Sequence, residues 1–154
     1  MLTRVTVIRH PRENLKKCSL RHLHAHPNFE FLKASDGFRF DATGFTVLEM
    51  NAPAISMEDF GRPLLLLDST WFLLPRIRAK IFGDFISRSL PPTGKTAYPR
   101  ESKMHSDPDG LATVEALYAA LKAIGDPDRS ILDGYHFAEK FLEINGWLPD
   151  IPRA

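Results

Sequence analysis

Four consecutive leucines, Leu64–Leu67, constrain the fold of this chain more than any other feature. Gly61-Arg62-Pro63 precedes the run and Asp68 follows it, so a short apolar segment stands between polar boundaries. Such a segment, apolar at every position, is typical of a strand that is buried on both faces of a parallel sheet. We therefore predict an α/β fold in which helices flank a parallel sheet.

Length and composition indicate one ordinary globular domain over residues 1–154. The apolar share is 44% and the charged share is 25%, both usual for such domains. Cys18 is the single cysteine, so no intramolecular disulfide can form. No apolar run approaches the ~18 residues of a membrane span, and the N-terminal residues do not resemble a signal peptide. We expect a cytoplasmic protein without membrane attachment.

Hydrophobic periodicity and turn residues predict the remaining elements. Strands are expected at residues 2–8 and 29–32, and a further strand or hairpin over 38–48. Residues 51–63 are expected to form a connection with a short helical turn. Helices are expected at 14–24, 72–86, 111–124 and 132–144. The long polar segment between the second and third of these helices is typical of a functional loop.

Polar residues follow the leucine run directly, as Asp68-Ser69-Thr70-Trp71. Ligands of open α/β sheets bind at the carboxyl ends of the strands, where these residues are expected. An acid, two hydroxyls and an indole can contact a ribose, an ammonium or a sulfonium, and tryptophan is the best aromatic partner of a cation. Alternatively, Asp68 caps the following helix and Trp71 belongs to the core. The local pattern leaves both interpretations open.

Two other patterns have both an ordinary and a functional interpretation. The free N–H groups at the start of helix 111–124 could hold a carboxylate or phosphate near Thr113, although any capped helix begins this way. His22, His24 and His26 alternate and would share one face of a strand. Because the flanking sequence is not clearly a strand and offers no nearby acid, we interpret them as polar surface residues and predict no metal site.

Positive charge is unevenly distributed in a chain whose formal net charge is only +1. Lysine and arginine concentrate in segments 4–21 and 76–103. If these two segments meet in the fold, they form a basic face suited to nucleic acid. Solvated loops and helix surfaces would give the same composition, and charge alone does not decide between the two.

Four motifs in this chain, taken in order, resemble those of the DTW-domain and ribosomal-RNA aminocarboxypropyltransferase family. They cover about residues 4–124, and Ala112 stands where the family usually has serine. In chain order, the matching segments are His10–Ser19, Leu67-Asp68-Ser69-Thr70-Trp71, Arg88–Pro91 and Leu111-Ala112-Thr113-Val114-Glu115-Ala116.

The resemblance implies a SPOUT-like α/β fold with a trefoil knot near the C-terminus. It implies S-adenosylmethionine as the donor of a 3-amino-3-carboxypropyl group, and a uridine-type base of rRNA or tRNA as acceptor. With such an acceptor, we expect the basic segments 4–21 and 76–103 to hold the RNA. The residues it assigns to the donor pocket are Ser19, Asp68, Trp71, Leu90 and Thr113. Asp68 is the candidate general base.

Two other functions remain open at this point. One is a methyltransferase of the same fold class, which would transfer the methyl group to RNA. The other is a non-catalytic module that binds RNA or a ligand. The weakly basic charge, and a loop at 92–109 that departs from the family's pattern, keep this alternative open.

Overall fold

A computed structural model describes residues 1–12, 20–70, 72–90 and 112–148 of the chain. Its centre is a five-stranded, wholly parallel sheet in the order β2-β1-β5-β4-β7. The strands are β1 (Val5–Arg9), β2 (Phe29–Lys33), β4 (Thr46–Leu48), β5 (Leu64–Asp68) and β7 (Ile86–Arg88). The leucine run forms β5 in the middle of the sheet, which confirms the prediction of a buried parallel strand.

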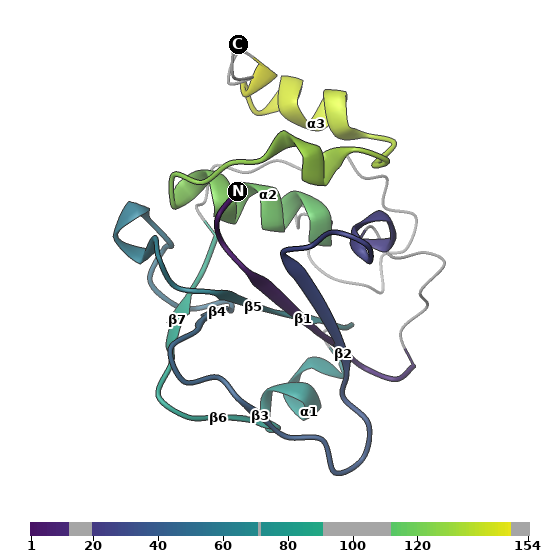
Figure 1. The fold of residues 1–154 in the computed structure, drawn as a ribbon, viewed down its shortest axis with the longest axis vertical. Coiled ribbons are helices and arrows are strands. Elements are labelled where there is room, and N and C mark those ends of the chain that lie inside the picture. The colour runs from purple at the N-terminus through teal and green to yellow at the C-terminus, as the bar shows by residue number, and fades with distance from the viewer. Residues whose placement is uncertain (13–19, 71, 91–111, 149–154) are drawn as a thin grey trace.

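Helices cover both faces of this sheet (Figure 1). On one face lie α2 (Thr113–Ala123), α3 (Ala138–Ile144) and the short 3-10 helix η4 (Arg129–Leu132). On the other lie α1 (Leu74–Arg78) and a small parallel ribbon of β3 (Phe40–Asp41) and β6 (Ile81–Phe82). Two further 3-10 turns are η2 (Arg21–Leu23) and η3 (Met57–Asp59). The α/β architecture with a flanked parallel sheet is thus confirmed.

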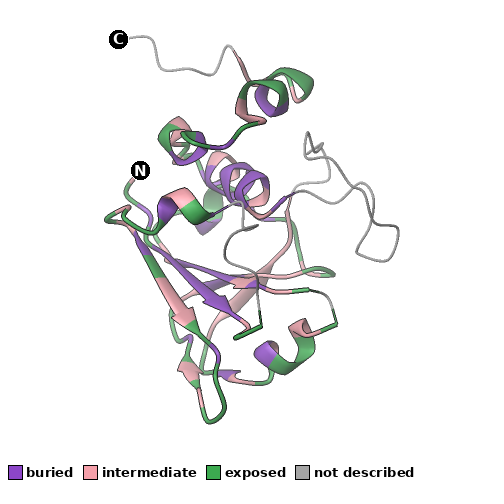
Figure 2. Cartoon of the chain, turned by 90° about the vertical axis from the view of Figure 1, so that its right-hand side faces the viewer, coloured by how far each residue is buried: buried purple, intermediate pink, exposed green. Residues whose placement is uncertain are grey.

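The alternation of side chains along the strands divides the apolar residues into two cores. Leu64 and Leu66 face α2 and pack with residues such as Leu117, in what we call the α2-side core. Leu65 faces the opposite way and packs with Ile77 of α1, in the α1-side core. Burying one such side chain contributes about 1.5–3 kcal/mol. Figure 2 shows the buried residues concentrated in the central strands and in α2.

The segment 72–86 differs from the single helix that its apolar spacing predicts. Helix α1 covers only Leu74–Arg78, and the chain then enters β6 and β7. Gly83 lies between these strands with φ +105°, a conformation that an α-helix cannot contain. An added Cβ there would collide with the side chains of Asp41 and Thr43. The apolar spacing of 72–86 therefore comes from three short elements that all pack on the α1-side core.

Other element boundaries also required correction. Residues 38–48 form no hairpin, because β3 pairs with β6 while β4 joins the main sheet. The last helix, α3, starts at Ala138, since η4 and a turn at Gly134 with φ +85° occupy the preceding residues. Of the helix expected at 14–24, residues 13–19 lie outside the described part, and the rest contributes only η2.

One carboxylate fixes the approach to β1. Asp126, just after α2, accepts hydrogen bonds from the backbone N–H of Leu2 (2.9 Å) and of Thr3 (2.8 Å), and from the Thr3 hydroxyl (2.6 Å). Burial opposes ionisation of Asp126, but these hydrogen bonds outweigh it and lower its pKa. The first strand is thereby tied to the helix layer before it enters the sheet.

The predicted knot and the expected absence of membrane helices both depend on segments that the structure only partly describes. The connection from β7 to α2 passes through residues 91–111, outside the described ranges, so the C-terminal knot and the SPOUT-like assignment stay predictions. Within the described residues, no helix is long and apolar enough to cross a membrane.

Candidate active site

The strand order creates one position where a ligand is favoured. From β1 the sheet continues to β2 on one side, whereas the later strands β5, β4 and β7 lie on the other. Connections on the two sides of such a reversal diverge and leave a crevice at the carboxyl ends of the strands. The reversal falls between β1 and β5, which places the crevice at the end residues of these strands, Arg9 and Asp68.

Arg9 and Asp68 form a buried ion pair at this position. They are register partners on neighbouring strands, and they are only 4% and 7% exposed. The Arg9 Nε atom lies 3.3 Å from Asp68 Oδ2, close enough for an ion pair although not aligned as a hydrogen bond. Burying either charge alone would cost several kcal/mol, so each makes the position of the other tolerable.

The first residue of α2 contacts the same carboxylate. The Thr113 hydroxyl donates a hydrogen bond to Asp68 Oδ1 at 3.2 Å. The start of the helix is held by Glu115, fully buried, which accepts a hydrogen bond from the backbone N–H of Ala112 at 2.8 Å. Because Ala112 has no side-chain oxygen, only this half of a capping box can form. The structure therefore brings together Asp68 and Thr113, two of the predicted site residues.

The other predicted site residues are placed less fully. Leu90, just after β7, is half-buried and packs against the α2-side core. Ser19 and Trp71 lie outside the described residues, so their predicted roles stay predictions. Helix α1 begins only at Leu74 and its N-cap residue is Leu73. The expectation that Asp68 caps that helix is therefore wrong, which leaves its carboxylate to the crevice.

The sequence did not single out Arg9, and it did not place His24 at this site. Arg9 reaches His24, whose Nε2 lies 3.2 Å from Arg9 Nη1, and its guanidinium lies 4.7 Å from the centre of the Phe31 ring. His24 stacks on that same ring, with ring centroids 4.1 Å apart. Burial, and secondly the charge of Arg9, lower the pKa of His24. A neutral imidazole can then accept a hydrogen bond from the guanidinium.

Further charged contacts lie at the carboxyl ends of the strands beyond β5. Glu49, after β4, contacts the side chains of Arg78 and Ser87, and Arg88 pairs with the buried Asp59 at 3.2 Å. Both of these acids are paired away from Arg9 and Asp68. In the described part of the chain, no three histidine, cysteine or acidic side chains converge as a metal site would require.

Of the three alternating histidines, only His24 is exposed as the sequence predicts. His24 is exposed at its outer face, while His22 and His26 are half-buried. His22 Nε2 lies 2.5 Å from the carbonyl oxygen of Ile131, and His26 packs edge-on against Phe29. The three rings thus have separate partners.

The whole fold is similar to that of a solved RNA-modifying enzyme. That structure is the SAM-dependent rRNA:acp-transferase Tsr3 from Vulcanisaeta distributa. The match has a TM-score of 0.73 at 26% sequence identity, and covers 95% of this chain and 80% of that one. No family model matches the chain, and no curated protein sequence does. The similarity to Tsr3 therefore extends over nearly the whole of this chain.

Proposed function

We propose that this protein transfers the 3-amino-3-carboxypropyl group of S-adenosylmethionine to a uridine-type base in RNA. The observation that carries the proposal is the Asp68–Thr113 contact at the topological switch point, within a fold similar to a SAM-dependent rRNA:acp-transferase. The order of the motifs around these residues, which resembles that of the aminocarboxypropyltransferase family, supports the same donor and the same transferred group.

The chemistry of the described residues fits such a donor. A sulfonium and an ammonium are positive, and Asp68 offers a carboxylate next to them. The donor's own carboxylate is negative, and the N-terminus of the 11-residue helix α2 is suited to hold it. The Thr113 hydroxyl has a single proton, so it would donate to that carboxylate only after releasing Asp68. Leu90 provides an apolar contact for the adenine. In this proposal Ser19 also binds the amino-acid part, and Trp71 packs against the methyl and sulfonium groups.

These residues would act mainly by positioning. The donor, when bound, supplies the aminocarboxypropyl group and leaves as methylthioadenosine, as the uridine N3 forms the new bond to carbon. Such a direct displacement depends on alignment of the two reactants. Asp68 is the proposed acceptor of the N3 proton. Since both of its oxygens already have protein partners, accepting that proton would require it to release one of them.

Isotope labelling tests the reaction directly. The protein is incubated with rRNA or tRNA and with S-adenosylmethionine labelled either in the carboxyl group or in the methyl group. Label from the carboxyl group in the RNA is the expected result. Label from the methyl group alone would instead identify a methyltransferase. If calorimetry detects no donor binding even at millimolar concentration, the protein is a non-catalytic module and the proposal is wrong.

A matched pair of variants tests the site. Asp68→Asn keeps the size of the side chain and removes its charge, so we expect donor affinity and transfer to fall together by at least about tenfold, or ~1.4 kcal/mol. Asp133→Asn makes the same change at an exposed acid on the turn after η4 and should leave both unchanged. Normal donor affinity and full transfer in Asp68→Asn would remove Asp68 from the site.

A further inference from the structure

A basic cleft opens at the same edge of the sheet as the candidate active site, on the α1 side. Its volume is about 550 Å³, and its lining comes from the carboxyl ends of β1 and β2 and from α1 with the turn that follows. His10 is one of the lining residues and directly follows Arg9 of the buried ion pair. Because consecutive Cα atoms are about 3.8 Å apart, the cleft begins within one residue of the crevice.

The cleft carries an excess of positive charge. Arg12, Arg76 and Lys80 line it together with a single acid, Asp36. Among the described residues, none of these three cations has an ion pair, whereas Arg9, Arg78 and Arg88 are each paired. A concave site in which cations outnumber acids attracts anions.

The available donors suit phosphate oxygens. Lys80 Nζ donates one hydrogen bond, to the carbonyl oxygen of Ser35 at 3.3 Å, and an ammonium has two further protons to donate. Arg12 and Arg76 are exposed at the rim, and a guanidinium can bind phosphate with two parallel hydrogen bonds. The two arginines come from the two basic segments that the sequence singled out, so both segments reach this cleft.

We propose that this cleft binds backbone phosphates of the single-stranded RNA segment that carries the target base. The inference rests on the proposed function, since it takes the ligand to be the RNA substrate. A base can reach the crevice beside Asp68 only when it is unstacked and unpaired, and its own backbone then lies close to the crevice, where the cleft is. Phosphate contacts fix the position of the strand and do not read its sequence.

Binding of a short fluorescent oligouridine, followed by anisotropy at several salt concentrations, tests this proposal. Arg12→Ala, Arg76→Ala and Lys80→Ala should each weaken binding, and each should lower the salt slope by about 0.7. The triple variant should lower the slope by about 2. Its affinity should then fall roughly tenfold less than that of the wild-type protein when salt rises from about 50 to about 200 mM. Oligoadenine should show the same changes, because the contacts are to phosphate.

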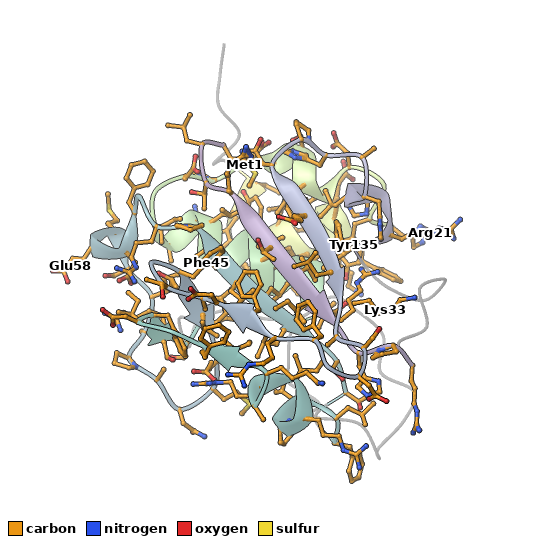
Figure 3. The ribbon with its side chains drawn as sticks, turned by 60° about the horizontal axis from the view of Figure 1, so that its bottom comes forward. Met1, Arg21, Lys33, Phe45, Glu58 and Tyr135 are labelled. Carbon is orange, nitrogen blue, oxygen red and sulfur yellow. The ribbon has the colours of Figure 1, made fainter. Side chains whose placement is uncertain are left out.

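Arg4→Ala is the matched control. Arg4 is exposed and belongs to the same basic segment as Arg12, but it precedes β1 and so lies at the opposite edge of the sheet. Figure 3 shows these two edges, with Met1 near one and Lys33 at the end of β2 on the other. Arg4→Ala removes one positive charge and should leave the affinity and the slope unchanged. Equal losses in Arg4→Ala and Arg12→Ala would overturn the proposal, since net charge alone would then explain them.

Donor binding, measured by calorimetry on the same variants, separates this inference from the proposed function. Normal donor binding with weakened RNA binding in the triple variant supports both. Normal donor binding with unchanged RNA binding overturns the cleft and leaves the enzyme proposal intact. If the wild-type protein binds no donor but the triple variant still loses RNA binding, the cleft stands and the proposed reaction is wrong. Binding of the wild-type protein to inorganic phosphate but not to either oligonucleotide would also overturn the cleft proposal.

Discussion

Replacing Arg9 by methionine measures how much the ion pair at the crevice contributes to stability. The two charges are 4% and 7% exposed, and the closest atoms are 3.3 Å apart. At an effective dielectric constant of about 20, a pair at that distance interacts by about 5 kcal/mol. Removing one partner of a buried pair typically costs about 3–5 kcal/mol, because the other charge stays buried. We expect Arg9→Met to lower the free energy of unfolding by this amount.

Urea unfolding followed by circular dichroism is a suitable assay, with exposed Arg21→Met as a control that should change stability by less than about 0.5 kcal/mol. The double variant Arg9→Met/Asp68→Leu removes both charges and should recover most of the lost stability, while binding no donor. A loss below about 1 kcal/mol in Arg9→Met, or no recovery in the double variant, would refute the view that the two charges are mutually dependent.

Three further predictions concern stability. Asp126 has a lowered pKa in the folded state, so its ionised form contributes to the free energy of unfolding. This contribution is complete above the usual pKa near 3.8 and is lost as the pH falls through the lower pKa of the folded state. Asp126→Asn should therefore flatten the acid part of a curve of stability against pH. Gly83→Ala should lower the free energy of unfolding, measured in urea, by more than about 1 kcal/mol. The loss should be clearly larger than in Gly37→Ala, because Gly37 also has a positive φ but has open space where the Cβ would be added. Because the pKa of His24 is lowered, protonation is disfavoured in the folded state, and the thermal midpoint should fall as the pH drops below about 6.5. This fall should be smaller in His24→Gln.

The sequence predicted those elements whose signal is local and strong. Leu64–Leu67 could hardly form anything but a buried strand, and the long apolar repeat of 111–124 gave α2 to within two residues at its start and one at its end. Segment 72–86 was predicted as one helix, because short elements that pack on the same core can have apolar residues at helical spacing. Only the positive φ of Gly83 and its closeness to Asp41 show that the chain must turn there.

The candidate site was predictable only in part, for a similar reason. Asp68 stood out because it ends the apolar run, at the edge where open α/β sheets bind their ligands. Arg9 did not, because its partner depends on the register between β1 and β5, and nothing within 2–8 reveals that register. The same limit applies to the basic cleft: composition indicated two basic segments, but only the fold shows that Arg12 and Arg76 line one cavity.

The position of β1 between β2 and β5 also determines the order in which this sheet can assemble. Its two partners are β2 and β5, and Val5 pairs with both Phe29 and Leu64, so the second pairing closes a far longer loop. During synthesis β1 must therefore wait for β5, and the Arg9–Asp68 pair forms late. High contact order of this kind slows folding. If the β1–β5 pairing is already formed at the rate-limiting step, Leu64→Ala should slow refolding. If the pairing forms after that step, the same substitution should mainly speed unfolding, and the crevice is then among the last features to appear.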